Sequence, residues 1–156
     1  MARVGSAGNP LTVAVVGSGP SGFYAAEALL NAGIDVRIHL IEKLPVPFGL
    51  VRYGVAPDHP RLKQVSLVFD RIAQDARVRY FGNVNVGCDV TLDELKSTHQ
   101  AVVLCCGAEL DRDLNLPGED LPGSHTATEF VAWYNGHPHF RDRCFDFSSE
   151  VAVIIG

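Results

Sequence analysis

Residues 12–22 read Thr-Val-Ala-Val-Val-Gly-Ser-Gly-Pro-Ser-Gly, and this stretch decides the fold. Its first five residues form a short, largely β-branched apolar run that is typical of a strand buried on both faces. Residues 23–32 follow with apolar side chains at helical spacing, and residues 36–42 alternate apolar and polar side chains as a strand does. A strand, a glycine-rich turn, a helix and a second strand together predict a βαβ unit.

The spacing of Gly17, Gly19 and Gly22 predicts a phosphate-binding turn between the first strand and its helix. The first glycine permits a tight turn, the second lets the backbone approach a pyrophosphate, and the third lets the helix pack close to the strand. The helix N-terminus adds unpaired N–H groups and a positive dipole. Pro20 and Ser21 lie in the same candidate binding segment. The structural alternative is a turn that merely uses glycine.

Glu42 ends the second predicted strand and follows Gly22 by 20 residues. A carboxylate at this place can accept hydrogen bonds from the ribose hydroxyls of an adenosine, and it would repel a 2′-phosphate. The glycine turn should therefore bind FAD or NAD rather than NADP. The simpler alternative for Glu42 is a solvated charge at the end of a strand.

The rest of the chain continues an α/β pattern. Residues 43–60 hold four prolines but also too many apolar side chains for disorder, so we expect an ordered loop packed over another part of the fold. Helices are expected at 60–75, 91–98 and 126–134, and strands within 79–86 and at 101–106. The fold class is therefore α/β, a Rossmann-like domain in which helices flank a parallel-rich sheet on both faces.

Composition excludes several classes of protein. The 156 residues carry a net charge of −5, with 47% hydrophobic and 20% charged residues, which predicts one soluble domain and gives no reason to expect nucleic acid as a partner. No apolar run is long enough to span a membrane. Cys105 and Cys106 lie in an apolar run, so we expect buried, reduced thiols. The N-terminal residues lack a secretory signal, which together with reduced thiols predicts a cytoplasmic location. His137 and His139 have no third partner at ligand spacing, so no metal is expected.

Within the long loop, residues 47–60 read Pro-Phe-Gly-Leu-Val-Arg-Tyr-Gly-Val-Ala-Pro-Asp-His-Pro. This segment resembles the signature of adrenodoxin reductase and its bacterial ferredoxin–NADP(+) reductase relatives. Further segments match that family in the same order along the chain, namely residues 17–22, 81–87, 116–123 and 133–138. The resemblance covers nearly the whole chain from about residue 11.

The resemblance implies an FAD-binding domain with the architecture of glutathione-reductase-type flavoproteins. A flavin needs a wall for its ring, and the loop glycine Gly49 allows close backbone approach to it. His59 matches a histidine near the flavin ring and is the candidate catalytic residue, although it could simply bond near the start of the following helix. The remaining residues that match cofactor contacts of the family are Ser21, Glu42, Leu50, Val86, Gly107 and Ala108.

By the same resemblance, the complete enzyme takes a hydride from NADPH to FAD and passes electrons singly to a ferredoxin-type iron–sulfur protein. We expect residues 1–10 to be disordered, residues 11–150 to form the FAD-binding domain, and residues 151–156 to be the first strand of an NADP-binding domain that this chain lacks. The alternative for 151–156 is a closing strand of one domain.

NADP(H) would then bind only to the complete protein, and NADPH oxidation by this chain alone is not expected. The alternatives for the chain itself are a non-catalytic dinucleotide-binding module and a misfolded fragment.

Overall fold

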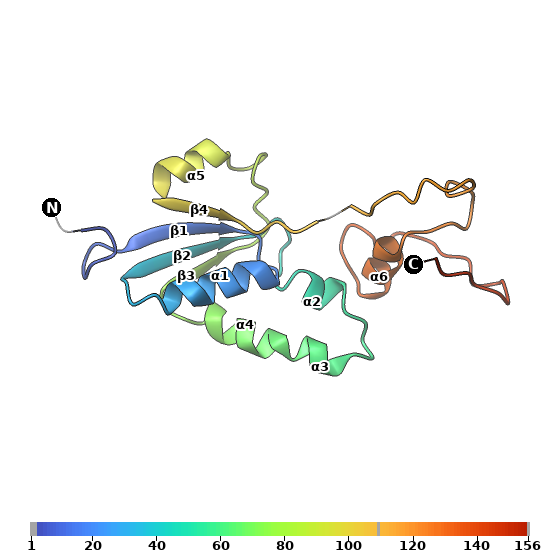
Figure 1. Ribbon diagram of the computed structural model, residues 1–156, viewed down its shortest axis with the longest axis horizontal. Helices are drawn as coiled ribbons and strands as arrows, with labels where there is room; N and C mark the ends of the chain where they lie inside the picture. Colours follow the sequence, from blue (N-terminus) through green and yellow to red (C-terminus); the bar gives the residue numbers. More distant parts are fainter. Residues whose placement is uncertain (1–2, 109, 156) are drawn as a thin grey trace.

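The computed structural model describes residues 3–108 and 110–155. Its centre is a four-stranded parallel sheet in the order β3-β2-β1-β4, as the sequence predicts for an α/β fold (Figure 1). The strands are β1 (Leu11–Val16), β2 (Val36–Ile41), β3 (Val78–Phe81) and β4 (Ala101–Leu104). Residues of β1 pair with both β2 and β4, so β1 is a central strand, which explains its uninterrupted apolar sequence.

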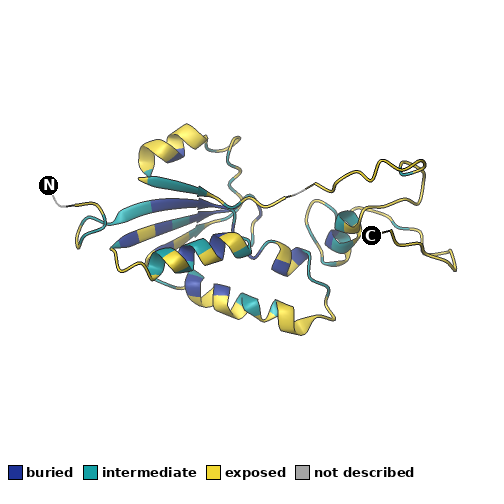
Figure 2. Ribbon diagram, viewed as in Figure 1, coloured by how far each residue is buried: buried dark blue, intermediate teal, exposed yellow. Residues whose placement is uncertain are grey.

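Helices cover both faces of the sheet, and alternate residues of each strand point to opposite sides. On one face, Val13, Val15 and Ile38 pack in a core cluster with Phe23 and Phe69, whose rings stack with centroids 4.7 Å apart. Those two rings belong to α1 (Pro20–Leu30) and α4 (Val65–Ala73). The opposite face has a smaller cluster that α5 (Leu92–Thr98) covers with its buried leucine. Figure 2 shows the buried residues concentrated in the sheet and in the inner faces of α1 and α4.

Several local predictions can be compared directly with the structure. The helix expected at 60–75 is divided into α3 (Pro60–Lys63) and α4 at Gln64, where the Leu67 N–H donates to the Gln64 carbonyl in a tighter, three-residue turn. Thr91 begins α5 with the capping box that its sequence indicates. The long loop is ordered as expected and contains α2 (Leu50–Tyr53).

Two expectations differ from the structure. Residues 3–10, expected to be disordered, form turns in which the Gly5 N–H donates to the Asn9 carbonyl and the Gly5 carbonyl accepts from Asp35. Cys106 is exposed rather than buried, because it lies beyond the end of β4, and Cys105 is only partly buried. Burial raises the pKa of the Cys105 thiol, so this thiol is largely protonated at neutral pH.

Residues 110–155 form an extended, largely irregular segment around α6 (Ala127–Tyr134) (Figure 1). The segment contacts the long loop through the rings of His137 and Tyr53, whose centroids lie 4.7 Å apart. It contacts α3 through Lys63, whose Nζ donates to Asn135 Oδ1 at 3.5 Å. Residues 151–155 form no strand, and their side chains are exposed. No described helix combines the length and apolar character needed to cross a membrane.

Candidate dinucleotide-binding site

The glycine turn lies at the carboxyl edge of the sheet, directly between β1 and α1. The Gly17 N–H donates to the Ile41 carbonyl at 2.8 Å, and the Cys105 N–H donates to the Val16 carbonyl at 2.7 Å. The ends of β2 and β4 thus hold the turn from both sides. In open parallel sheets, the carboxyl edge beside the central strand is the usual place for a ligand.

Two of the three glycines are required by the fold itself. Gly17 has φ +101°, and a Cβ added there would lie 2.3 Å from the carbonyl oxygen of Cys105. A Cβ on Gly22 would lie 2.0 Å from the carbonyl oxygen of Gly17. Any side chain at either position would force the strand, turn and helix apart, so these glycines fix the shape of the turn whether or not a ligand binds.

Gly19 is different, because nothing in the fold requires a glycine there. Its φ is −79°, which any residue adopts, and a Cβ built on it meets no heavy atom within 4 Å. Among the glycines that the structure describes, it alone has neither a positive φ nor a close neighbour at the Cβ position. It caps α1, whose first N–H groups have no partner within the helix. The space beside Gly19 therefore suits an anionic ligand that approaches the backbone.

Glu42 is buried and holds the turn in place. Its Oε2 accepts hydrogen bonds from the Ser18 N–H at 2.9 Å and the Ser18 hydroxyl at 2.7 Å, and its Oε1 accepts from the Leu44 N–H at 3.1 Å. The interpretation of Glu42 as a solvated charge is therefore wrong. A carboxylate offers about four acceptor positions, so three internal bonds leave room for one ribose hydroxyl. Sequence reasoning missed Ser18, because its position between two glycines carries no chemical signal of its own.

The long loop lies against the glycine turn. The Phe48 N–H donates to the Ser18 carbonyl at 2.9 Å, and a Cβ added to Gly49 would lie 3.0 Å from the Gly19 Cα. The Phe48 ring is buried 5.5 Å from the ring of Phe23 in α1, while its backbone has the unusual φ of +91°. Burial of the ring stabilises this strained conformation and keeps Gly49 beside the turn.

The other predicted cofactor contacts take different places around this edge. Gly107 and Ala108 follow β4 and are exposed, and Gly107 has φ +71°. Val86 is partly buried on the α5 side of the sheet, in a segment whose Val84 N–H donates to the Glu42 carbonyl. Leu50 begins α2 immediately after Gly49 and is 66% exposed, although it is apolar.

The structure does not bring His59 into this group. His59 precedes α3 and is exposed, and its Nδ1 lies 2.9 Å from the Asp58 carboxylate. Its side chain makes no capping hydrogen bond, but His59 is the N-cap residue of α3 and bonds Asp58 just before that helix, as the structural alternative expects. Among the residues described, no group of three or more acidic, histidine or cysteine side chains could hold a metal ion.

Two tyrosines interact with Glu42 and are neutral at physiological pH. Burial raises the pKa of Tyr80 to about 12, so its phenol stays protonated and donates to the Leu44 carbonyl at 3.3 Å. Burial also raises the pKa of Tyr53. These hydroxyls remain neutral hydrogen-bonding groups at physiological pH, and they add no negative charge where a phosphate would bind.

Residues 15–81 match the NAD(P)-binding Rossmann-like domain family. The NADPH-ferredoxin reductase FprA of Mycobacterium leprae is 52% identical over 149 residues, which are 92% of this chain and 33% of that protein. The mitochondrial NADPH:adrenodoxin oxidoreductase of Salvelinus fontinalis is 52% identical over 144 residues, which are 92% of this chain and 29% of that protein.

This chain is a homologue of the adrenodoxin reductase-like ferredoxin–NADP reductases. The fold agrees with this relationship. Mycobacterium tuberculosis FprA in complex with NADPH superposes with a TM-score of 0.82 at 52% identity, over 85% of this chain and 30% of that structure. The chain spans about a third of the length of the reductases it matches.

Proposed function

We propose that residues 11–150 are the FAD-binding part of a ferredoxin–NADP(+) reductase. The observation that carries this proposal is Gly19, whose missing Cβ has no explanation in the packing of the chain and fits a pyrophosphate at the N-terminus of α1. Glu42 would bind the adenosine ribose with the acceptor position that Ser18 and Leu44 leave free. Ser21, which is exposed in the first turn of α1, would contact the phosphates.

The long loop favours FAD over NAD. Gly49 lies against Gly19, so the loop forms one wall beside the turn, and the exposed Leu50 offers an apolar surface there. A flavin ring has a large apolar face that such a wall would cover. Gly107 and Ala108, beyond β4, would supply backbone on the other side, and Val86 would approach from the α5 face. When bound, FAD accepts a hydride and releases electrons one at a time.

The complete reductase would oxidise NADPH and reduce a ferredoxin-type iron–sulfur protein, because the relatives are named for those activities. Residues 151–156 would begin the NADP-binding unit; Gly156 lies outside the described residues. The exposed apolar side chains of Val153 and Ile154 suit a strand that pairs with chain outside this segment.

His59 would act near the nicotinamide of NADPH only if the long loop changed its conformation and moved His59 toward the flavin. The cytoplasmic location stays a prediction, since some relatives are named as mitochondrial.

A single substitution tests the cofactor assignment. Gly19→Val should abolish or weaken FAD binding at least about tenfold, because its side chain would occupy the space of the pyrophosphate while leaving the fold intact. Ala32→Val, the same kind of enlargement at the exposed C-terminal end of α1, should leave binding unchanged. The measurement is the flavin absorbance that co-purifies with the chain, together with titration of FAD into apo-protein. Equal FAD retention by Gly19→Val would overturn the proposal.

A further inference from the structure

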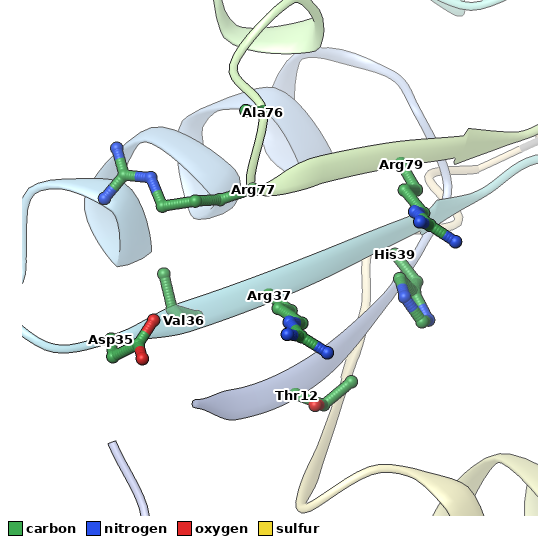
Figure 3. Close-up of a pocket in the computed structure, with 8 residues that line it drawn as sticks. All are labelled: Thr12, Asp35, Val36, Arg37, His39, Ala76, Arg77 and Arg79. Atoms are coloured by element: carbon green, nitrogen blue, oxygen red, sulfur yellow. The ribbon is translucent and has the colours of Figure 1, made fainter. Parts of the chain in front are cut away.

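A cationic hollow lies on the sheet face opposite α1 and α4. Arg37 and His39 of β2 and Arg79 of β3 extend side by side from this face, as Figure 3 shows, and His39 and Arg79 are register partners. The hollow has a volume of about 490 Å³ and is also lined by Thr12 and Asp35. Its size falls in the range of pockets that hold small molecules.

Asp35 lines the hollow, but no ion pair joins it to Arg37 or Arg79 in the described chain. Both arginines pair with neighbouring strands through their backbones, but neither guanidinium group forms an ion pair or hydrogen bond with a residue that the structure describes. Arg77, by contrast, pairs with Asp75 at 2.7 Å and points away from the other two arginines in Figure 3. Arg79 is in register with His39, so Arg37 is its diagonal neighbour on the next strand. Like charges at this diagonal spacing repel, and a ligand that pairs with both guanidinium groups would be stabilising.

His39 adds a third donor whose orientation is set by α5. His39 Nδ1 lies 2.9 Å from His99 Nε2, and His99 Nδ1 lies 3.0 Å from the Leu95 carbonyl. Thr98 Oγ1 lies 2.9 Å from the same Nδ1, but its hydroxyl donates to the Glu94 carbonyl at 2.8 Å. Both neighbours of His99 Nδ1 therefore accept, which places the His99 hydrogen on Nδ1 and lets its Nε2 accept from His39. His39 Nε2 is therefore the nitrogen that is free to gain a proton. Protonation of His39 would create another N–H donor without breaking its bond to His99.

We propose that this hollow is a second anion-binding site, separate from the glycine turn, which binds a small phosphorylated molecule. Guanidinium groups match phosphoryl oxygens with paired, charge-assisted hydrogen bonds, and Arg37 and Arg79 present two of them on neighbouring strands. Asp35 and Thr12 also line the hollow. The Asp35 carboxylate would repel a second phosphoryl group, and both side chains suit hydroxyl groups of the ligand. The ligand therefore has a phosphoryl group at one end and hydroxyls at the other.

Binding should depend on the protonation of His39. Burial, His99, Arg79 and Arg37 all lower the pKa of His39, and Asp35 is the carboxylate that lines the same hollow. An anion that binds beside His39 would raise its pKa, so affinity should increase as the pH falls from 8 to 6. Because phosphates also titrate in this range, the pH dependence is compared between the Gly19→Val chain and the same chain carrying His39→Gln, in which it should be smaller.

The experiment uses the full chain carrying Gly19→Val, so that the glycine turn does not contribute. AMP and glycerol 3-phosphate, each with one phosphoryl group and free hydroxyls, are titrated at constant ionic strength, with binding followed by calorimetry and by the NMR signals of the histidine rings. The double variant Arg37→Gln/Arg79→Gln should lower the affinity about tenfold or more, since it removes two charge-assisted interactions. Arg71→Gln, on the exposed surface of α4, should leave it unchanged. Circular dichroism confirms that each variant is folded.

Equal affinity of the Gly19→Val chain with and without Arg37→Gln/Arg79→Gln would overturn the proposal, as would tighter binding of hexaglutamate than of either phosphate compound. The second result would identify an acidic protein surface as the ligand instead. Binding of AMP or glycerol 3-phosphate would support a soluble phosphate ester as the source of the phosphoryl group, whereas binding of phosphatidate vesicles with no binding of either ester would assign that group to a lipid.

Discussion

At the scale of single residues, Glu42 has both a structural and a predicted binding role, and one substitution affects both. Glu42→Ala would leave the Ser18 N–H, the Ser18 hydroxyl and the Leu44 N–H without their acceptor. The free energy of unfolding should fall by about 2–4 kcal/mol, because unsatisfied buried donors cost about 1–3 kcal/mol each and local relaxation recovers part of this. Urea unfolding measures the change.

Glu27→Ala is the matched control, since Glu27 lies on α1 away from the turn. It should change the unfolding free energy by less than about 0.5 kcal/mol. If Glu42→Ala is as stable as the control, the carboxylate does not hold the turn. Glu42→Ala could weaken FAD binding by removing the ribose contact or by loosening the turn. Measuring unfolding and FAD binding on the same sample separates these two effects.

At the scale of elements, one residue of the long loop anchors it to the core, and another is predicted to contact the cofactor. Phe48 is buried against Phe23, whereas Leu50, two residues later, is 66% exposed. Phe48→Ala should lower the free energy of unfolding by about 3–5 kcal/mol, since it leaves a cavity in the core. Leu50→Ala should leave stability within about 0.5 kcal/mol but reduce FAD affinity. Thermal unfolding of each variant, with and without FAD, measures both effects. Equal losses of stability in Phe48→Ala and Leu50→Ala would contradict the different roles assigned to these two residues.

The elements that the sequence predicts well are those with a strong local signal. The buried β1, the capping box at Thr91 and the glycine turn each combine a pattern with a known backbone requirement, and the structure contains all three. Predictions failed where a residue's burial or hydrogen bonding depends on segments that are distant in the sequence or on where an element ends. Burial of Cys106 depends on where β4 ends, and the Ser18–Glu42 bonds depend on two segments meeting in space. The row formed by Arg37 and Arg79 appears only once β2 and β3 are aligned.

At the scale of the whole molecule, the apolar segment 151–155 has no partner surface among the described residues. Val153 is 81% exposed and Ile154 is 94% exposed, in an uncharged, β-branched run of the kind that pairs with other chains. The isolated chain should therefore self-associate through this segment. Val153→Lys/Ile154→Lys should increase the monomer fraction in size-exclusion chromatography and light scattering, because charges at strand edges oppose pairing.

The control for self-association is Leu110→Lys, which replaces a single apolar side chain that is 91% exposed but lies in no apolar run. It should leave the monomer fraction nearly unchanged, since isolated surface apolar residues are common and contribute little to association. An equal improvement in both variants would mean that net charge, not the segment, governs association. If residues 151–156 begin an NADP-binding unit, as we propose, Val153→Lys/Ile154→Lys should lower the stability of a longer chain that contains this unit, because the same side chains would then lie inside a sheet, where buried charge is costly.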